Sequence, residues 1–174
     1  MIIEKALEKI ALESEADRVV IAFIHPKLNL ESKTEEGFNI IETVFSIHHE
    51  YCREGTKSIK NIVKDKPISI LKLESKNIEQ NIMFAKCTPW LPSKCSRHFH
   101  NIGCEVIINQ FINSHYYTLG IFSMQYKNMH TAKYRNKEQA LKNKEVLYRY
   151  KEEITSIITK VKAKEKEINN NIKA

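Results

Sequence analysis

The sequence contains few of the residues that mark unusual protein classes. Only four of its 174 residues are glycine and four are proline, which excludes collagen-like and low-complexity chains. Four cysteines are too few for a disulfide scaffold, so we expect reduced thiols. The longest apolar run, Val19–Ile24, is far shorter than the roughly 18 residues of a membrane helix. No signal-peptide pattern begins the chain, and we expect a cytoplasmic protein that does not contact membranes.

The positive charge is concentrated near the C-terminus. The net charge is +7, and residues 133–174 carry 12 Lys or Arg against 6 Asp or Glu. A basic helix can attract nucleic acid. However, the glutamates are interleaved with the lysines, and the rest of the chain lacks the basic and aromatic stripe of single-strand binders. We therefore expect a solvated helix face and no binding of nucleic acid.

The apolar pattern predicts an α+β domain. An amphipathic helix over residues 2–13 precedes a buried strand, Arg18–Ile24, which Pro26 should end because proline cannot donate to a sheet ladder. Residues 27–36 look like a polar loop. Further along the chain we predict a strand over Phe38–Cys52, a helical turn with an apolar face over residues 58–66, an irregular segment over 87–103, and a hairpin of strands 104–112 and 116–126. Gly120 inside the last strand indicates a bulge or a close backbone approach.

A long helix is predicted to close the domain. Asn136 can cap it, and Gln139 completes a capping-box arrangement. A heptad seam follows, formed by Ala140, Leu147, Ile154, Val161 and Ile168. We divide the chain into a body over residues 1–136, a helix of the same domain over 137–168 and a frayed tail over 169–174. Because the second half of the seam would overrun the sheet, we expect a homodimer through this helix.

The order of elements and several short motifs resemble the GAF domain. Residues 16–19, Ala-Asp-Arg-Val, look like the family's entry into its first strand, and residues 107–126 look like its late hairpin. The resemblance covers nearly the whole chain. It implies an antiparallel sheet of five or six strands, with the N- and C-terminal helices on one face and a small-molecule pocket on the other. Asp17 and Arg18 would be structural residues at the junction of helix and strand.

A narrower likeness is to small phage-encoded GAF-like proteins. Residues 16–18, the segment 23–26 around His25, and residues 46–55 with their His-His-Glu-Tyr run resemble motifs of that group. Pro26 and Lys27 stand where the group has Asn-Gly, so a turn at this position is not implied. This resemblance implies a phage-encoded protein that acts in the host cytoplasm or in the virion.

The histidines supply the candidate ligand site. Successive strand residues alternate between faces, so we expect His48 and Glu50 on one face and His49 and Tyr51 on the other, with one pair facing the pocket. His25 should lie nearby, at the end of its strand. The irregular segment should cover the pocket. The predicted ligand-binding residues are His25, His48, His49, Glu50, Tyr51, Trp90, Arg97, His98 and His100.

A cysteine- and histidine-rich segment offers an alternative chemistry. Cys95, His98, His100 and Cys104 would be the ligands of any metal, together with Cys87 upstream. The paired CxxC pattern of structural zinc sites is absent, so we expect no stoichiometric zinc and predict no cofactor. The same thiols could serve an enzyme if Arg97 and His98 lowered their pKa values.

Three functions follow. The first is a non-enzymatic module, phage-encoded, that binds a small molecule or a host protein. The cyclic-nucleotide and bilin signatures of GAF domains cannot be placed in this sequence, since Cys95 is followed by Ser96 and not by histidine. The second is a structural or assembly protein of a virion on the same fold. The third is a thiol- or metal-dependent enzyme that uses the Cys87–Cys104 segment.

Overall fold

The structure is a computed structural model that describes residues 2–71, 78–79, 82–86, 94–113, 118–127 and 137–173. Its elements are α1 (Ile2–Ser14), β1 (Arg18–Lys33), β2 (Asn39–Cys52), β3 (Lys66–Pro67), the 3-10 helix η1 (Ile68–Leu71), β4 (Ile78–Glu79), β5 (Ile82–Lys86), α2 (Lys94–Asn101), β6 (Val106–Asn113), β7 (Thr118–Tyr126) and α3 (Lys137–Lys173). The long helix α3 does not end at Ile168 but continues to Lys173. The predicted cap residue Asn136 lies outside the described residues.

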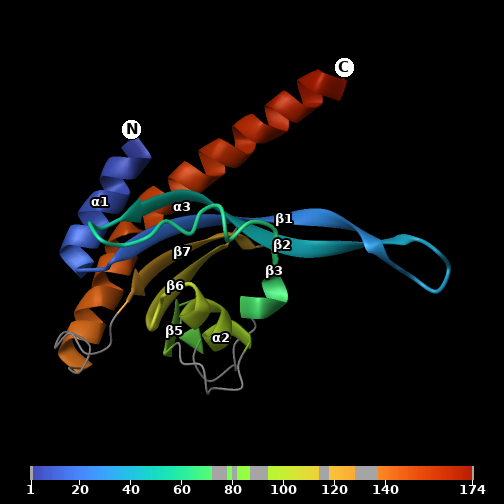
Figure 1. The fold of residues 1–174 in the computed structure, drawn as a ribbon. Coiled ribbons are helices and arrows are strands. Elements are labelled where there is room, and N and C mark those ends of the chain that lie inside the picture. The colour runs from blue at the N-terminus through green and yellow to red at the C-terminus, as the bar shows by residue number, and fades with distance from the viewer. Residues whose placement is uncertain are drawn as a thin grey trace.

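The strands form one antiparallel sheet in the order β3-β2-β1-β7-β6-β5-β4. Five strands are long, while β3 and β4 have two residues each. Helices α1 and α3 cover one face, and α2 lies on the other (Figure 1). The predicted α+β architecture is confirmed, with both terminal helices on one face. Part of the segment predicted as irregular, residues 94–101, is instead the helix α2.

Each face of the sheet has its own apolar core. On the helix face, Val19, Ile21 and Phe23 of β1 pack with Leu7 and Ile10 of α1. On the opposite face, Val20 and Ala22 pack with residues of β2, α2 and the segment 53–65. The strict alternation along β1 explains why residues 19–23 are continuously apolar, since both faces of this central strand are buried.

Gly120 allows β7 to approach β1 closely. It pairs with Phe23, and a Cβ atom at this position would lie 2.7 Å from the carbonyl oxygen of Ala22. No real side chain tolerates that distance without a shift of the backbone. The predicted close approach at Gly120 is thus confirmed.

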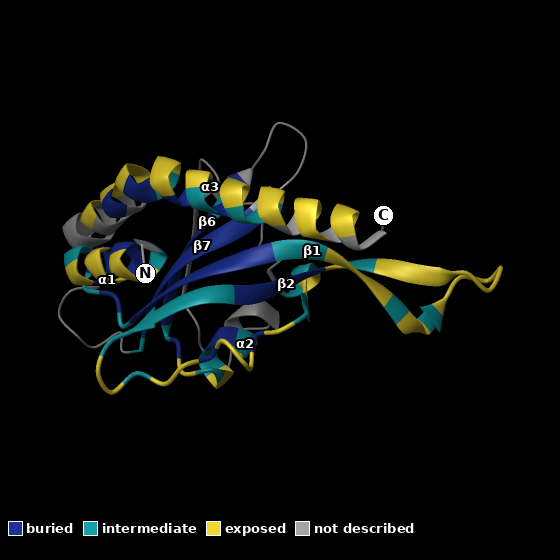
Figure 2. Ribbon diagram, turned by 90° about the horizontal axis from the view of Figure 1, so that it is seen from above, coloured by how far each residue is buried: buried dark blue, intermediate teal, exposed yellow. Residues whose placement is uncertain are grey.

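Pro26 does not end the first strand. β7 pairs with β1 only as far as Phe23, and beyond it β1 continues with β2 as its single neighbour. A proline is tolerated there because only one side of the strand carries ladder hydrogen bonds. The predicted loop over residues 27–36 is therefore mostly strand, and β1 and β2 form a two-stranded arm that projects from the body (Figures 1 and 2). Its turn places Gly37 at φ 87°.

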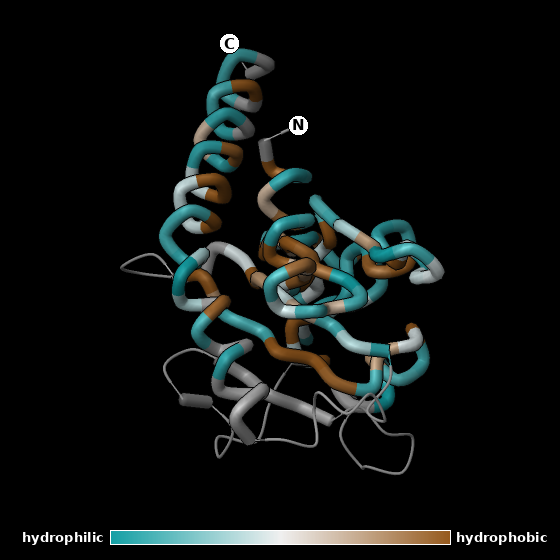
Figure 3. The backbone as a smooth tube through the Cα atoms, turned by 90° about the vertical axis from the view of Figure 1, so that its left-hand side faces the viewer, coloured by the Kyte–Doolittle hydropathy of each residue, from teal (hydrophilic) through white to brown (hydrophobic). Residues whose placement is uncertain are grey.

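The helix α3 packs on the sheet through buried residues that recur at every fourth position. Val146, Tyr150, Ile154 and Ile158 are buried in the helix-face core, and Figure 3 shows hydrophobic residues recurring on the side of α3 that faces α1. The prediction that the second half of the seam has no partner within the chain is wrong. Ile154 is fully buried, and Ile157 and Val161 pack against the same core. Of the described seam residues, only Ile168 is exposed.

Candidate functional site

A bulge in β2 separates the predicted ligand residues. Ile21 pairs with His49 while Ala22 pairs with Ile47, so His48 is an extra residue in the ladder. As a result both histidines lie against Phe23 on the helix face, with ring centroids 4.2 Å away for His48 and 6.4 Å away for His49. The predicted pairing of His48 with Glu50 on one face is therefore wrong, because the bulge breaks the alternation.

Burial on the helix face affects the protonation and packing of these β2 side chains. Burial lowers the pKa of His49, which favours its neutral form. Tyr51 also packs against the helix-face core. His48, His49 and Tyr51 thus support the packing of the sheet against α1 and α3.

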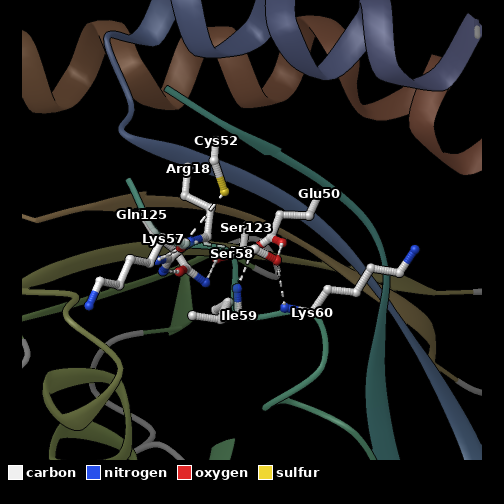
Figure 4. Close-up of polar contacts among 9 residues, drawn as sticks. All are labelled: Arg18, Glu50, Cys52, Lys57, Ser58, Ile59, Lys60, Ser123 and Gln125. Atoms are coloured by element: carbon white, nitrogen blue, oxygen red, sulfur yellow. Dashed lines mark hydrogen bonds and ion pairs between the residues drawn. The ribbon is translucent and has the colours of Figure 1, made fainter. Parts of the chain in front are cut away.

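Glu50 belongs to a buried polar centre on the opposite face (Figure 4). Its carboxylate accepts hydrogen bonds from the Ser58 hydroxyl and from the backbone N–H of Ile59, the latter over 2.9 Å. The Nε atom of Arg18 lies 3.4 Å from the same carboxylate, and both side chains are at most 5% exposed. The Glu50 carboxylate therefore holds the chain after β2 against the sheet.

Arg18 completes this polar centre from the start of β1. Its Nη1 donates to Oε1 of Gln125 over 2.8 Å, and its Nη2 donates to the carbonyl of Lys57 over 2.6 Å. Nearby, the Asp17 carboxylate accepts from the backbone N–H of Lys127 over 2.8 Å. These contacts confirm that Asp17 and Arg18 are structural, since each fixes chain segments that are distant in sequence.

A small cavity lies beside the polar centre, at the middle of the sheet. It measures about 20 Å³ and is lined mainly by apolar residues, with Asn109, Ser123 and Gln125 as polar members. The Oδ1 atom of Asn109 has no hydrogen-bond partner among the described residues. A cavity of this size holds one water molecule and nothing larger.

A second, open pocket is large enough for a ligand. It measures about 470 Å³, within the range typical of small-molecule sites. We call it the edge pocket, because it lies where β1 and β2 leave the sheet. Its described lining residues are Ile24, His25, Pro26, Thr43, Ile68, Phe111 and Lys162. They are mostly apolar, and they include two basic side chains and no carboxylate.

The two basic side chains of the edge pocket are held in place by neighbouring groups. Lys162 of α3 donates through Nζ to the carbonyl of Ile24 over 2.7 Å, and Nζ lies 5.9 Å from the centre of the Phe23 ring. The Nε2 atom of His25 lies 3.1 Å from Oδ1 of Asp65. Both side chains are thus positioned before any ligand binds.

Asp65 links the chain before β3 to the root of the arm. Its second carboxylate oxygen accepts from Nζ of Lys27 over 2.8 Å, and its backbone N–H donates to the Ser46 hydroxyl over 2.8 Å. Asp65 has a positive φ of 51°, which is uncommon for a residue other than glycine or asparagine. The hydrogen bonds from Lys27 and His25 lower the pKa of Asp65 from 3.8 to about 2.

Replacing Asp65 by asparagine should therefore change how stability depends on pH. The pKa of Asp65 is lower in the folded chain than in the unfolded chain, so its carboxylate stabilises the fold above about pH 3.8, and this stabilisation is lost as the pH falls through about 2. Asparagine tolerates the positive φ. We expect Asp65→Asn to unfold more easily at neutral pH, with the difference from the wild type shrinking between these two pH values.

Urea unfolding at a series of pH values measures this difference. Glu31→Gln is the matched control, since Glu31 is exposed on the arm and should not alter the pH dependence. A difference between Asp65→Asn and the wild type that stays constant down to pH 2 would refute the assignment to the Asp65 carboxylate.

Arg97, His98 and His100 lie on α2 and are not among the described lining residues of the edge pocket. Arg97 is exposed, while His98 and His100 are partly buried. Burial lowers the pKa of His98. His98 and His100 are two residues apart on one helix and do not face each other. Trp90 lies outside the described residues.

The described residues do not assemble the alternative metal site. Among them, no group of three or more His, Cys, Asp or Glu side chains could hold a metal ion. Cys104 is buried, and its thiol donates to the carbonyl of Val106 over 3.1 Å. Cys87 and the side chain of Cys95 lie outside the described residues.

Among the predicted ligand residues that the structure describes, only His25 lines the edge pocket. Sequence reasoning noticed Lys162 only as part of the basic helix, and it missed Asp65, Thr43 and Phe111. The basic pattern of the helix could have drawn attention to Lys162, but nothing in the sequence around Asp65 indicates its contact with His25. Of the predicted residues in β1 and β2, the edge pocket thus includes His25 and none of His48, His49, Glu50 and Tyr51.

Comparisons with known proteins give the fold. No protein-family model matches the sequence, and no curated protein matches it significantly. Among solved structures, the chain is similar to the GAF domain of a two-component sensor histidine kinase from Bacillus halodurans, with a TM-score of 0.58 and 17% identity over 93% of this chain and 94% of that chain.

Two further structures have the same arrangement. One is the GAF domain of Thermosynechococcus elongatus PixJ in its blue-light-absorbing form, with a TM-score of 0.56 and 10% identity over 96% of this chain and 88% of that chain. The other is the GAF3 domain of a Synechocystis protein in its photoproduct state, with a TM-score of 0.56 and 6% identity over 92% and 96%. No described helix is long and apolar enough to cross a membrane. The chain has a GAF-like fold.

Proposed function

We propose that the chain is a non-enzymatic GAF-like module that binds a small organic anion with an apolar body in the edge pocket. The observation that carries this proposal is the pocket of about 470 Å³ whose apolar wall holds two positioned basic side chains, Lys162 and His25. A basic side chain held in place beside an apolar wall favours a carboxylate, sulfonate or phosphate attached to a hydrophobic group. The similar solved structures support a sensory role.

The thiols of the described residues favour binding over catalysis. Burial, followed by the nearby Glu50 carboxylate, raises the pKa of the Cys52 thiol, so it carries little of the reactive thiolate. Cys104 is buried in the core. We also propose that the module needs no metal. Its phage origin, its action in the host cytoplasm and a host-protein partner are proposals that rest on the sequence motifs alone.

A virion structural protein is the second candidate. The cavity on the sheet face opposite α1 and α3, the face on which the sequence predicts the pocket, measures only about 20 Å³. We expect a protein that keeps this fold without binding a ligand to fill its pocket with side chains in this way. The edge pocket distinguishes the two candidates, because a purely structural protein has no reason to bind the probes described next.

A pair of fluorescent probes tests the proposed ligand class. Anilinonaphthalene sulfonate is an anion with two aromatic groups, and phenylnaphthylamine is its analogue without the sulfonate. We expect the native protein to bind the sulfonate at one site and more tightly than the neutral analogue. Lys162→Met should weaken binding of the sulfonate about tenfold or more, since hydrogen bonds to charged groups contribute roughly 1.5–3 kcal/mol. It should leave phenylnaphthylamine unaffected.

The matched control for this titration is Lys160→Met, two residues away on the exposed side of the same helix. If neither probe binds, the edge pocket is not a ligand site. If both probes bind equally and Lys162→Met changes neither affinity, the pocket takes a neutral ligand and the proposed anion is wrong.

A further inference from the structure

The arm, residues 26–43, carries an unusual share of exposed apolar side chains. The large hydrophobic residues that are exposed on it are Leu28 (48%), Leu30 (71%), Phe38 (67%), Ile40 (37%) and Ile41 (69%). Figure 2 shows the arm exposed along its length, in contrast to the buried part of β1. Exposed apolar groups gathered on one projecting element mark an interaction surface.

The apolar surface of the arm continues from the edge pocket. Leu28 and Ile41 are directly opposite in the ladder, as are Pro26 and Thr43 two positions closer to the body. Opposed strand residues share a face, and residues two apart along a strand share it too. Because Pro26 and Thr43 line the edge pocket, Leu28 and Ile41 extend its wall outward along the arm.

The C-terminal end of α3, beyond Lys162, is a second projecting surface on the same side of the molecule. The helix is roughly 55 Å long at 1.5 Å per residue, and its last turns and the arm both project beyond the sheet in diverging directions (Figure 1). Ile168 is 57% exposed there, and Lys160, Lys164 and Lys166 are exposed around it.

The two projecting elements have opposite charge. The arm contains four glutamates and two lysines, and one of these lysines, Lys27, is offset by Asp65 at 2.8 Å. Residues 159–173 of α3 contain five lysines and two glutamates, and one of these lysines, Lys162, donates to the carbonyl of Ile24 within the chain. Two arms would repel each other, whereas an arm and an α3 end attract. Since every copy carries both surfaces, a second copy can cover the arm and the α3 end of the first copy at the same time.

We propose that the arm of each copy lies on the C-terminal part of α3 of a second copy, in a two-fold homodimer. Leu28 and Ile41 would contact the partner around its exposed Ile168, and Glu35 and Glu36 would lie near its lysines. A two-fold axis repeats this contact twice and closes the assembly. This interface differs from pairing of α3 with itself, and it does not depend on the ligand of the edge pocket.

Sedimentation equilibrium of the full chain tests the interface. We expect a species of twice the 20.4 kDa chain mass at micromolar concentration, weakened by added salt because salt screens exposed charges. Ile41→Glu should weaken the dimer about tenfold or more. Ile62→Glu is the matched control, since Ile62 is 55% exposed but lies outside the arm. A monomer in the wild type, or a dimer that Ile41→Glu leaves unchanged, overturns the proposal.

Mixing two variants identifies what the arm contacts. Ile41→Glu alters the contact surface of the arm, and the double change Lys164→Glu with Lys166→Glu alters the contact surface of the helix. A mixed dimer of these chains keeps one wholly intact contact, from the helix of the first chain and the arm of the second. For equal amounts of the two chains, random pairing gives twice as much mixed dimer as either homodimer, so native mass spectrometry should show the mixed dimer at well above this twofold ratio. A 1:2:1 mixture, or no mixed dimer, would contradict contact between arm and helix.

Discussion

Replacing Arg18 by alanine should lower the free energy of unfolding by about 3–5 kcal/mol, the usual cost of leaving one partner of a buried ion pair uncompensated. Arg18 and Glu50 are nearly inaccessible to solvent. The substitution also removes the hydrogen bonds to Gln125 and to the carbonyl of Lys57. Urea unfolding followed by circular dichroism measures the change. We expect the chain after β2 to lose its attachment to the sheet.

Two further variants establish that the buried charge causes this loss. Arg53→Ala removes one hydrogen bond from a partly buried arginine to the carbonyl of Glu15, and it should cost much less. Adding Glu50→Gln to Arg18→Ala should restore part of the stability, because a neutral amide then replaces the unpaired carboxylate. If Arg18→Ala costs no more than Arg53→Ala, the polar centre does not stabilise the fold as described.

The second large effect is expected at the contact between α3 and the sheet. Ile154 is fully buried in the helix-face core, and truncating such a residue to alanine typically costs about 2–5 kcal/mol through lost burial and the cavity left behind. Ile168→Ala is the matched control on the same helix, with both variants unfolded at a protein concentration low enough for the chain to be monomeric. Since Ile168 is 57% exposed, its truncation should change stability by no more than about 0.5 kcal/mol.

Chemical unfolding of the two variants separates docking on the sheet from a free helix. A large loss for Ile154→Ala and a negligible one for Ile168→Ala agree with the structure. Equal and small losses would mean that α3 is not packed on the sheet, and the heptad seam would again be available for pairing with a second copy.

Much of the fold follows from hydrophobic periodicity. The stripe of α1, the continuous apolar run of β1 and the hairpin of β6 and β7 each bury a defined face, and burial leaves a readable pattern in the sequence. Residues 27–33 of the arm look like a loop in the sequence because neither of their faces is buried against the body, so no alternation is imposed on them. The helix α2 is also difficult to predict, because it is short and largely polar and Phe99 is its buried apolar residue.

The site was less predictable because it depends on register and on distant contacts. The bulge at His48 appears only when β2 is aligned with β1, and it decides which side chains reach each face. Lys162 and Ile24 are 138 positions apart, yet they are joined by a hydrogen bond. The sequence predicts His25 at the end of its strand, whereas β1 continues past it to Lys33. Its partner Asp65 is fixed by a turn with positive φ that no sequence pattern indicates.

The most direct test of the account locates a bound ligand. Amide NMR spectra of the protein, recorded during titration with anilinonaphthalene sulfonate, report which residues the probe contacts. We predict the largest shifts at Ile24, His25, Thr43 and Phe111, with small shifts at Ile47, Asn109 and Ser123 around the small cavity. The largest shifts at the second group would place the ligand at the middle of the sheet and contradict the assignment of the edge pocket as the binding site.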